Sequence, residues 1–268
     1  MITSNTNSQI KNIVKLMKSS SKRKEQGVYL VEGIRIFREI PQDELVKFYL
    51  TEECAKNLNV DYDWEEGADY EYVSDSVMKS IADTCNPQGI IAIVRQKKYK
   101  KEDILQAMNL NDTSQKRSSC ILLLEHLQDP GNLGTILRTA EGAGVAGILM
   151  SEDTADIYNP KVVRATMGSI FRLPFCYTDD SKETVIWLKS KGVQCCAAHL
   201  SGTDLYGHDF RQPTCFFIGN EGSGLTDELT NLADVRLTIP MSGKVESLNA
   251  ATAATVLMYE AFRQNYIS

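Results

Sequence analysis

The feature that most constrains the fold is a regular alternation of apolar strands and amphipathic helices after residue 119. It begins with the apolar run CILLLEHL, which is typical of a parallel strand buried on both faces. Helical and apolar segments then alternate as far as a final helix, LNAATAATVLMYEAFRQN. Such alternation predicts a parallel sheet covered by helices on both faces. We therefore assign residues 119–268 to one α/β domain.

A smaller unit precedes this domain. Residues 8–18 space their apolar side chains as a helix does, and the run GVYLVEG that follows is typical of a strand. Two further strands, a short helix and a helix capped by Ser74 or Asp75 are predicted before the apolar strand GIIAIVRQ. This pattern indicates a small α/β domain over residues 1–95. The polar residues 96–118 are expected to form a connector with one short helix.

Composition limits the class of protein. A chain of 268 residues, 43% of them hydrophobic, can form two modest domains. Because it has neither a long apolar run nor the apolar core of a secretory signal, we expect a cytoplasmic location and no membrane partner. The seven cysteines form no CxxC pair and only three histidines accompany them. We therefore expect reduced thiols and no metal site.

One glycine motif is misleading. Gly142, Gly144 and Gly147 spell GxGxxG, which in a dinucleotide-binding fold follows a strand and opens a helix. Here the predicted helix comes before the glycines and the strand after them. We therefore interpret the three glycines as a helix end followed by a tight turn.

Three loops carry the strongest functional signals, and each comes directly after a predicted strand. They lie within residues 125–134, 216–225 and 237–249. In open α/β sheets, ligands bind beyond the carboxyl ends of the strands, so loops that are distant in sequence can meet there. We expect these three loops to form one site.

Each loop contributes a different kind of residue. In the first, Asp129 or Asn132 can cap a helix in which Arg138 follows about two turns later, on roughly the same side as Asn132. An arginine on an apolar helix face calls for an anionic partner. The second loop spaces three glycines around Glu221, and glycine permits close backbone approach to a ligand. The third feeds the final helix, with Ser247 or Asn249 as its N-cap.

Taken together and in this order, the three loops closely resemble the three successive motifs of the SpoU/TrmH family of RNA 2′-O-methyltransferases, in the SPOUT superfamily. The residues that carry the resemblance are NLGTILR, IGNEGSGL and IPMSGKVESLNAATAATVLMYE. It covers residues 119–268, and residues 159–175 resemble the segment between the first two motifs. The N-terminal part, marked by GVYLVEG and NPQGIIAIV, resembles the RNA substrate-binding domain often joined to this family, which is similar to a ribosomal-protein fold.

The resemblance implies a fold, a cofactor and an assembly. Family members pass their C-terminal segment through a loop and so form a trefoil knot, which neither periodicity nor spacing predicts. They bind S-adenosyl-L-methionine at the knot and work as homodimers whose RNA site combines both subunits. Carried over by position, the cofactor-binding residues are Gly219, Ile239, Met241, Leu248 and Asn249, with Ser247 adjacent.

The resemblance also assigns the key catalytic role to Arg138. Free arginine is a poor base, so we interpret Arg138 as stabilising the developing alkoxide and clamping a neighbouring phosphate. The remaining catalytic candidates, Asn132, Glu221, Ser247 and Asn249, would orient Arg138, the ribose and the cofactor. Glu221 can pair with Arg138 and hold its planar fork in place.

The expected partner is RNA, although the net charge is −6. The first 24 residues contain six basic side chains and no acidic one, and such a local patch can bind a phosphate backbone. The phosphate contacts predicted in this context are Lys22, Arg23, Lys24, Arg35, Lys161 and Arg164.

Ribosomal RNA of the large subunit is favoured over transfer RNA because of the additional N-terminal domain. Three alternatives stay open. The chain can be a transfer-RNA 2′-O-methyltransferase, a ribosome assembly factor that binds RNA without catalysis, or an unrelated nucleotide-binding enzyme. The sequence names neither the modified nucleotide nor the state of the RNA substrate.

Overall fold

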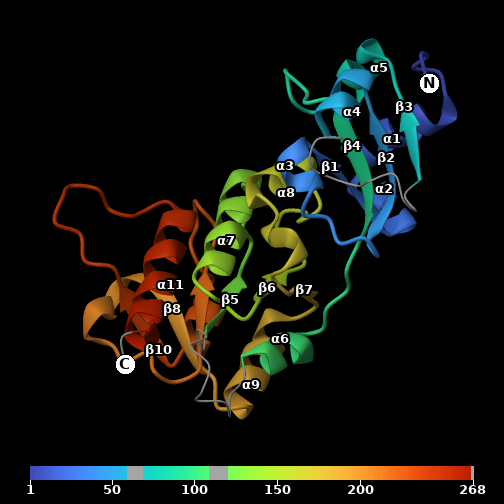
Figure 1. Ribbon diagram of the computed structural model, residues 1–268. Helices are drawn as coiled ribbons and strands as arrows, with labels where there is room; N and C mark the ends of the chain where they lie inside the picture. Colours follow the sequence, from blue (N-terminus) through green and yellow to red (C-terminus); the bar gives the residue numbers. More distant parts are fainter. Residues whose placement is uncertain (59–68, 109–119, 267–268) are drawn as a thin grey trace. The chain divides into compact units, whose positions relative to one another are not determined.

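The computed structural model describes residues 1–58, 69–108 and 120–266 (Figure 1). The chain forms two compact units, each with its own sheet. Unit 1 contains Met1–Lys97 together with Asp156–Phe171, and unit 2 contains Lys98–Ala155 and Arg172–Ser268. The segment Asp156–Phe171 therefore packs with the N-terminal residues, although it follows the first strands of the second domain in sequence. Residues 109–118 of the expected connector lie outside the described residues.

Unit 1 is built on a mixed four-stranded sheet with the strand order β1-β4-β2-β3. Strands β1 (Val28–Glu32) and β2 (Leu45–Leu50) run antiparallel to β4 (Ile90–Arg95), whereas β3 (Tyr70–Tyr72) runs parallel to β2. One face is covered by α1 and α5, whose apolar side chains form a buried cluster with those of the strands. The helices of the unit are α1 (Ser8–Lys18), α2 (Ser20–Gln26), α3 (Ile34–Phe37), α4 (Glu52–Leu58), α5 (Asp75–Ile81), α8 (Pro160–Thr166) and the 3-10 turn η1 (Ser169–Phe171).

Unit 2 is built on a six-stranded sheet with the order β10-β8-β9-β5-β6-β7, and every pair of neighbouring strands in it is parallel. This confirms the parallel sheet predicted from the alternating pattern. The strands are β5 (Cys120–Leu124), β6 (Ile148–Ser151), β7 (Phe175–Thr178), β8 (Gln194–Asp204), β9 (Thr214–Ile218) and β10 (Val235–Thr238).

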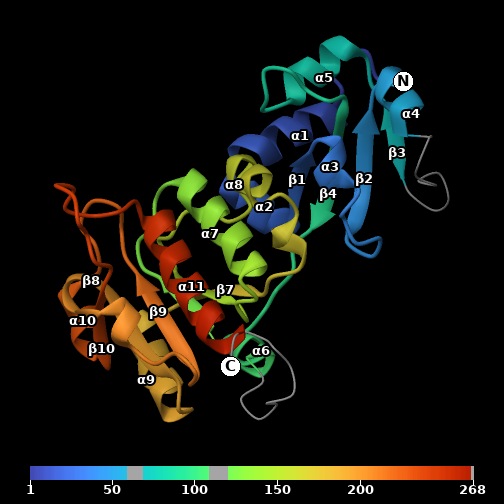
Figure 2. The same cartoon turned by 60° about the vertical axis from the view of Figure 1, so that its left-hand side comes forward.

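Helices cover both faces of this sheet, as predicted. On one face, α6 (Lys101–Ala107), α9 (Ser181–Ser190) and α10 (Asp227–Leu232) bury their apolar side chains against the strands. On the other face, α7 (Pro130–Gly142) and α11 (Ala250–Tyr266) pack against each other (Figure 2). A short 3-10 turn, η2 (Leu205–Gly207), follows β8. No helix within the described residues is both long and apolar enough to span a bilayer.

The glycines of the misleading motif act as predicted. Helix α7 ends at Gly142, and Gly144 then adopts a φ of +68°. A Cβ atom on Gly147 would lie 2.9 Å from the carbonyl oxygen of Pro174. The three positions therefore end a helix and turn the chain into β6. All seven cysteines are free in the structure.

Candidate functional site

The three predicted loops meet beyond the carboxyl ends of β5, β9 and β10. These strands are parallel members of one sheet, so their carboxyl ends share one edge. The loops are joined by side chains from three distant parts of the sequence. The Nδ2 of Asn249 donates to the Oδ1 of Asn132 at 2.9 Å, and the Nδ2 of Asn132 donates to the Oε1 of Glu221 at 2.9 Å.

Glu221 holds the first loop in place from the second. Its carboxylate also accepts from the backbone N–H of Asp129 at 3.0 Å and of Gln128 at 3.2 Å. Partial burial by itself would raise the pKa of Glu221, but these donors, with Asn132, outweigh it and lower the pKa below the ordinary value. The carboxylate is therefore ionised at neutral pH and acts only as an acceptor.

Asn249 has a second role as the N-cap of α11. Its Oδ1 accepts from the backbone N–H of Ala251 at 2.9 Å and of Thr252 at 3.3 Å. Because the helix start takes the oxygen, the amide nitrogen is left to face Asn132. The sequence had left Ser247 and Asn249 as alternative caps, and the structure selects Asn249. In α7, likewise, Asp129 rather than Asn132 is the cap.

Two further residues shape the second loop, and the sequence did not predict either of them. The Oδ1 of Asn220 accepts from the N–H groups of Gly222 and Ser223, and its Nδ2 donates to the carbonyl of His126 at 2.8 Å. His126 has a φ of +55°, which is uncommon outside glycine. Its ring contacts the carboxylate of Asp153, which holds this strained residue in place. Both residues lie in loops that the sequence singles out, but nothing in the sequence signals the hydrogen bonds of Asn220 or the backbone conformation of His126.

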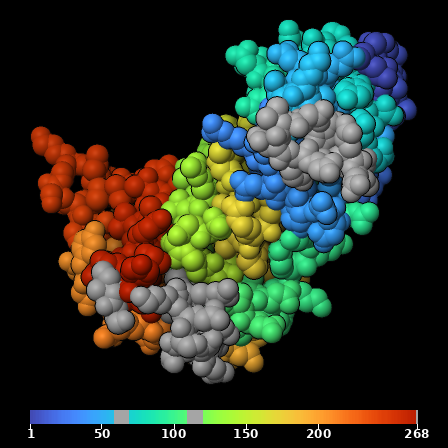
Figure 3. Space-filling view, in the orientation of Figure 1, coloured from blue at the N-terminus to red at the C-terminus, as the bar shows by residue number. Residues whose placement is uncertain are grey.

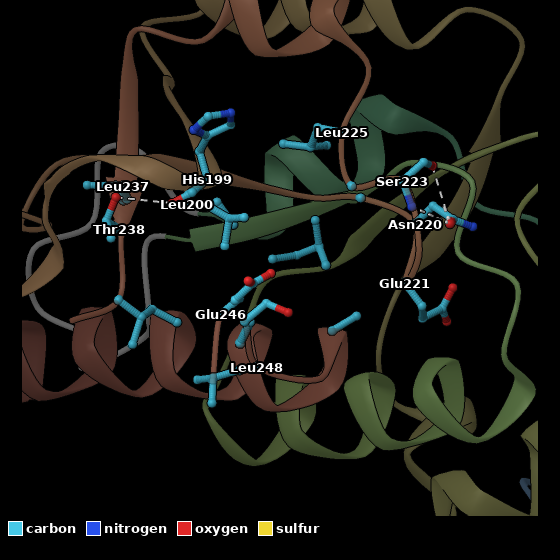
Figure 4. A pocket seen from close by; sticks show the side chains of 18 of the residues that line it. His199, Leu200, Asn220, Glu221, Ser223, Leu225, Leu237, Thr238, Glu246 and Leu248 are labelled. Carbon is cyan, nitrogen blue, oxygen red and sulfur yellow. Dashed lines mark hydrogen bonds between the residues drawn. The ribbon is translucent and has the colours of Figure 1, made fainter. Parts of the chain in front are cut away.

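A cavity of about 550 Å³ opens between the second loop, the third loop and the middle of β8 (Figure 4). Most of the predicted catalytic and cofactor-binding residues outside α7 line it, namely Gly219, Glu221, Ile239, Met241, Ser247 and Leu248. Asn249 does not line it, although both of its sequence neighbours do. His199 and Leu200 in the middle of β8, and Glu246 in the third loop, also line the cavity, and the sequence analysis did not predict them.

Glycine is required at position 219. A Cβ atom there would overlap the backbone of Gly224 and Leu225, where the second loop folds back on itself. The third loop, by contrast, is largely exposed and stands out from the surface of unit 2 (red in Figure 3). The cavity therefore has one tightly packed wall and one protruding wall.

Arg138 lies apart from this hydrogen-bonded network. It is exposed on α7, and no hydrogen bond or ion pair joins its guanidinium to a described residue. Glu221 does not pair with it, contrary to the sequence-based interpretation, because the oxygens of Glu221 are taken by the first loop. The shared side expected for Asn132 and Arg138 is also wrong. Six residues advance a helix by about 600°, which leaves the two side chains about 120° apart.

The six predicted phosphate contacts all lie in unit 1, and one of them is not available. Arg23 is only 3% exposed, and its guanidinium donates to Asp156 and to the carbonyl oxygens of Leu16 and Met17. The sequence pattern of neighbouring basic residues could not distinguish this buried position from its exposed neighbours. Of the other five, Lys24, Arg35 and Lys161 are exposed, whereas Lys22 pairs with Glu25 and Arg164 pairs with Asp83.

No group of three histidine, cysteine, aspartate or glutamate side chains is placed to hold a metal ion in the part of the chain that the structure describes. The polar lining of the cavity consists of backbone groups, the amide of Asn220, hydroxyl groups, the ring of His199 and the carboxylates of Glu221 and Glu246, among apolar side chains. This lining suits an organic ligand with both apolar and polar parts.

Two family models match the chain, and together they span most of it. Residues 119–259 match the SpoU rRNA Methylase family, and residues 7–92 match the MRM3-like substrate binding domain. The first match contains all three loops. The second contains most of unit 1.

Relatives that are named as RNA methyltransferases also match the chain. A 23S rRNA (uridine(2479)-2′-O)-methyltransferase of Streptomyces viridochromogenes is 40% identical over 149 residues, which is 53% of this chain and about half (52%) of that relative's length. The 23S rRNA (guanosine(2553)-2′-O)-methyltransferase RlmP of Bacillus subtilis is 30% identical over 96% of this chain and 97% of its own. An uncharacterized tRNA/rRNA methyltransferase of Synechocystis is 32% identical over 99% and 94%.

Solved structures extend the likeness to both units. An AdoMet-bound rRNA methyltransferase from Sinorhizobium meliloti superposes with a TM-score of 0.81 at 29% identity, covering 98% of this chain and 97% of that one. The SpoU methyltransferase AviRb from Streptomyces viridochromogenes, in complex with AdoMet, gives 0.82 at 26% identity, covering 98% and 99%.

Proposed function

The chain belongs to the SpoU rRNA methylase family, and on that premise we propose that it transfers a methyl group from S-adenosylmethionine to a ribose 2′-hydroxyl of large-subunit ribosomal RNA. The observation that carries this function is the junction of the three motif loops through Asn249, Asn132 and Glu221, of which Glu221 also lines the cavity. This junction brings the reacting groups of both substrates to one edge of the sheet.

The cavity fits S-adenosylmethionine in size and in chemistry. Its volume of about 550 Å³ lies in the range of small-molecule sites. Leu200, Ile239 and Leu248 offer apolar contacts, and the backbone at Gly219 offers polar ones where no side chain intervenes. When bound there, S-adenosylmethionine supplies a methyl group that its positive sulfur has already activated for attack.

Arg138 provides the charge that the reaction requires. A ribose hydroxyl becomes a strong nucleophile only as it loses its proton, and negative charge then develops on its oxygen. Arginine is a cation and a poor base, so Arg138 acts by stabilising this charge and by clamping an RNA phosphate through its planar fork. The proton leaves to that phosphate or to water. Because no described residue of the chain pairs with Arg138, its fork is available to RNA.

The other catalytic candidates act by holding the loops and helices of the site in position. Glu221 fixes the first loop, Asn132 transmits that constraint to Asn249, and Asn249 fixes the start of α11. Ser247 lines the cavity two residues before Asn249. These contacts hold α7, and with it Arg138, in a constant relation to the cofactor cavity within unit 2.

Unit 1 supplies contacts to the RNA. The exposed cations Lys24, Arg35 and Lys161 are suited to phosphate, and Lys22 and Arg164 add charge at partly exposed positions. Ribosomal RNA is favoured because two of the relatives are named for 23S rRNA and because a substrate-binding model covers residues 7–92. One relative is named for transfer RNA and ribosomal RNA alike, so transfer RNA is the second candidate.

We also propose a cytoplasmic homodimer of knotted catalytic domains, with residues 1–95 as the substrate-binding domain and 119–268 as the catalytic domain. Two observations support a partner subunit. Arg138 lacks a partner among the described residues, and Tyr259 and Tyr266 expose their rings along α11, next to α7. Exposed aromatic side chains of this kind are enriched at protein interfaces.

The function is tested by incubating the protein with S-adenosylmethionine labelled in its methyl group and with unmodified 23S rRNA or bulk tRNA. We expect label in 23S rRNA, at a single ribose 2′-oxygen. Label in tRNA alone would replace the proposed substrate. Binding of S-adenosylmethionine without transfer to any RNA, tested on naked RNA and on ribosomal particles, would instead identify a non-catalytic assembly factor.

A further inference from the structure

Unit 1 contains a second cavity, of about 510 Å³, that no step of methyl transfer uses. It opens where β1, β2 and β3 end and where the antiparallel strand β4 begins. Lining residues therefore come from four places in the sequence, between Ile34 and Gly89. Every one of them lies within residues 7–92, which match the substrate binding domain.

The loop that forms one wall of this cavity, residues 82–89, is fixed at both ends. At its start, the carboxylate of Glu32 accepts from the N–H of Asp83 at 2.8 Å, and Asp83 pairs with Arg164 at 2.6 Å. At its end, the Oε1 of Gln88 accepts from the N–H of Ile34 at 2.8 Å. These contacts hold an exposed loop in one conformation, which lowers the entropy cost of binding a ligand against it.

Gly89 lines the cavity where the loop packs against Thr51 and Cys54. It adopts a φ of +83°, and a Cβ atom there would lie 2.6 Å from the Oγ1 of Thr51 and 2.9 Å from the Cβ of Cys54. The loop therefore reaches the sheet only because this position has no side chain. Thr51 and Cys54 are both buried beneath it.

The chemistry of the lining favours a nucleobase over a phosphate. Asn57 and Asn86 line this cavity at exposed positions, and their side-chain amides make no hydrogen bond with a described residue. The charged lining residues are two carboxylates, Glu53 and Asp75, and one cation, Lys79, so the local charge disfavours an anion. Amide and carboxylate groups instead match the donors and acceptors on base edges.

We propose that this cavity binds an unpaired nucleobase of the RNA substrate, at a nucleotide other than the one that is methylated. Paired bases in an RNA helix hide their edges, whereas a base in a loop or bulge can be inserted into a cavity and recognised there. The proposal rests on the proposed function, since it takes RNA as the substrate. It adds a point of sequence recognition to the phosphate contacts of unit 1.

The first test measures RNA affinity of the full chain carrying Asn57→Ala or Asn86→Ala, with 23S rRNA transcribed in vitro. Each loss of a hydrogen bond should weaken RNA binding by roughly 2- to 12-fold. The salt dependence should stay unchanged, because no phosphate contact is lost. S-adenosylmethionine affinity and kcat at saturating RNA should equal those of the wild type. The control is Asn12→Ala, also in unit 1 but outside the cavity, where Asn12 pairs with Gln26.

The second test uses Cys85, which lines the cavity and is the exposed one among the seven cysteines. RNA should protect it from alkylation by N-ethylmaleimide, and S-adenosylhomocysteine should not. A Cys85→Ser variant identifies the labelled site. Burial raises the pKa of the half-buried Cys176 to about 11, which keeps that thiol unreactive at neutral pH.

The two proposals fail in different ways because RNA binding is measured without turnover. Wild-type RNA affinity in both asparagine variants, or equal alkylation of Cys85 with and without RNA, would overturn the base-binding cavity even if methyl transfer is intact. Cavity-dependent RNA binding without methyl transfer would overturn the proposed function and leave the cavity standing. Absence of RNA binding by the wild type would overturn both.

Discussion

The side-chain amide of Asn249 donates a hydrogen bond of 2.9 Å to the side-chain oxygen of Asn132, which lies 117 positions earlier in the chain. Because Asn249 caps α11 and Asn132 lies in the first turn of α7, this contact links the starts of the two helices that flank the site. Glu221 extends it to the second loop. The site is therefore held by a continuous chain of hydrogen bonds.

Asn132→Ala should interrupt this chain at its centre. It removes both the donor to Glu221 and the acceptor for Asn249, so we expect kcat/KM to fall by roughly 10- to 100-fold. Asn132→Asp should be worse at neutral pH, since it places a second carboxylate beside Glu221. Methyl-transfer kinetics check both. Asn231→Ala, on the surface of α10, is the matched control, and equal losses in it and in Asn132→Ala would contradict the assignment.

The pKa of Glu221 gives a pH dependence with a defined sign. Since its hydrogen bonds lower the pKa in the folded protein, the carboxylate contributes stability that is fully present above its ordinary pKa of 4.5. This contribution is lost as the pH falls through the lowered value. Glu221→Gln should therefore be less stable than the wild type at pH 7, and the difference should shrink below pH 4.5. Denaturant unfolding at several pH values measures it; a difference that grows as the pH falls would reverse the sign.

Arg138→Ala should abolish methyl transfer while leaving the fold and cofactor binding intact. Its side chain is exposed and lies outside the cavity, so its removal exposes no core. We expect a loss in kcat of at least about 100-fold, the usual cost of removing one stabilising group at a developing oxyanion. Single-turnover kinetics and calorimetric titration with S-adenosylmethionine separate the two effects. Arg211→Ala, exposed and paired with Asp209, is the control. Near-normal turnover of the Arg138→Ala protein would show that Arg138 has no catalytic role.

Two glycines of the second loop should respond differently to the same change. Gly219→Ala places a Cβ atom into the backbone of Gly224 and Leu225, so we expect loss of S-adenosylmethionine binding and a lower melting temperature. In Gly222→Ala, the nearest atom is the Oδ1 of Asn220 at 3.5 Å, which is ordinary van der Waals contact. This variant should bind the cofactor normally. Similar affinities in both variants would show that the close approach at Gly219 is unimportant.

Arg23 and Lys24 are adjacent in sequence, but substituting them should have different effects. Loss of Arg23 should lower stability, whereas loss of Lys24 should weaken RNA binding. Arg23→Ala leaves Asp156 without its partner, and we expect unit 1 to lose about 3 kcal/mol of stability. Lys24→Ala should change stability by less than about 0.5 kcal/mol but reduce the slope of RNA affinity against salt by about one. Thermal unfolding and RNA titrations at several salt concentrations check both. If the Arg23→Ala protein were as stable as the wild type and its RNA affinity depended less on salt, Arg23 would be a phosphate contact after all.

Local patterns in the sequence were sufficient for most of the secondary structure. The helix Ser8–Lys18 and the strand Cys120–Leu124 lie where apolar spacing predicted them. Helix α2, with the sequence SSKRKEQ, was missed because it contains no apolar residue and therefore shows no hydrophobic period. Its start is marked only by the cap at Ser19.

What the sequence by itself determined about this protein is its class of fold and the loops that form the site. Strand and helix periodicity are local properties of the sequence. The order of the three loops along the chain is also read directly from the sequence, because it does not depend on how the side chains pack. Tertiary structure alone decided that Arg23 is buried against Asp156, that Glu221 binds the first loop rather than Arg138, and that Asp156–Phe171 packs with unit 1. Each of these depends on which distant groups compete for the same hydrogen bonds and the same buried space, and that competition is settled only when the whole chain is folded.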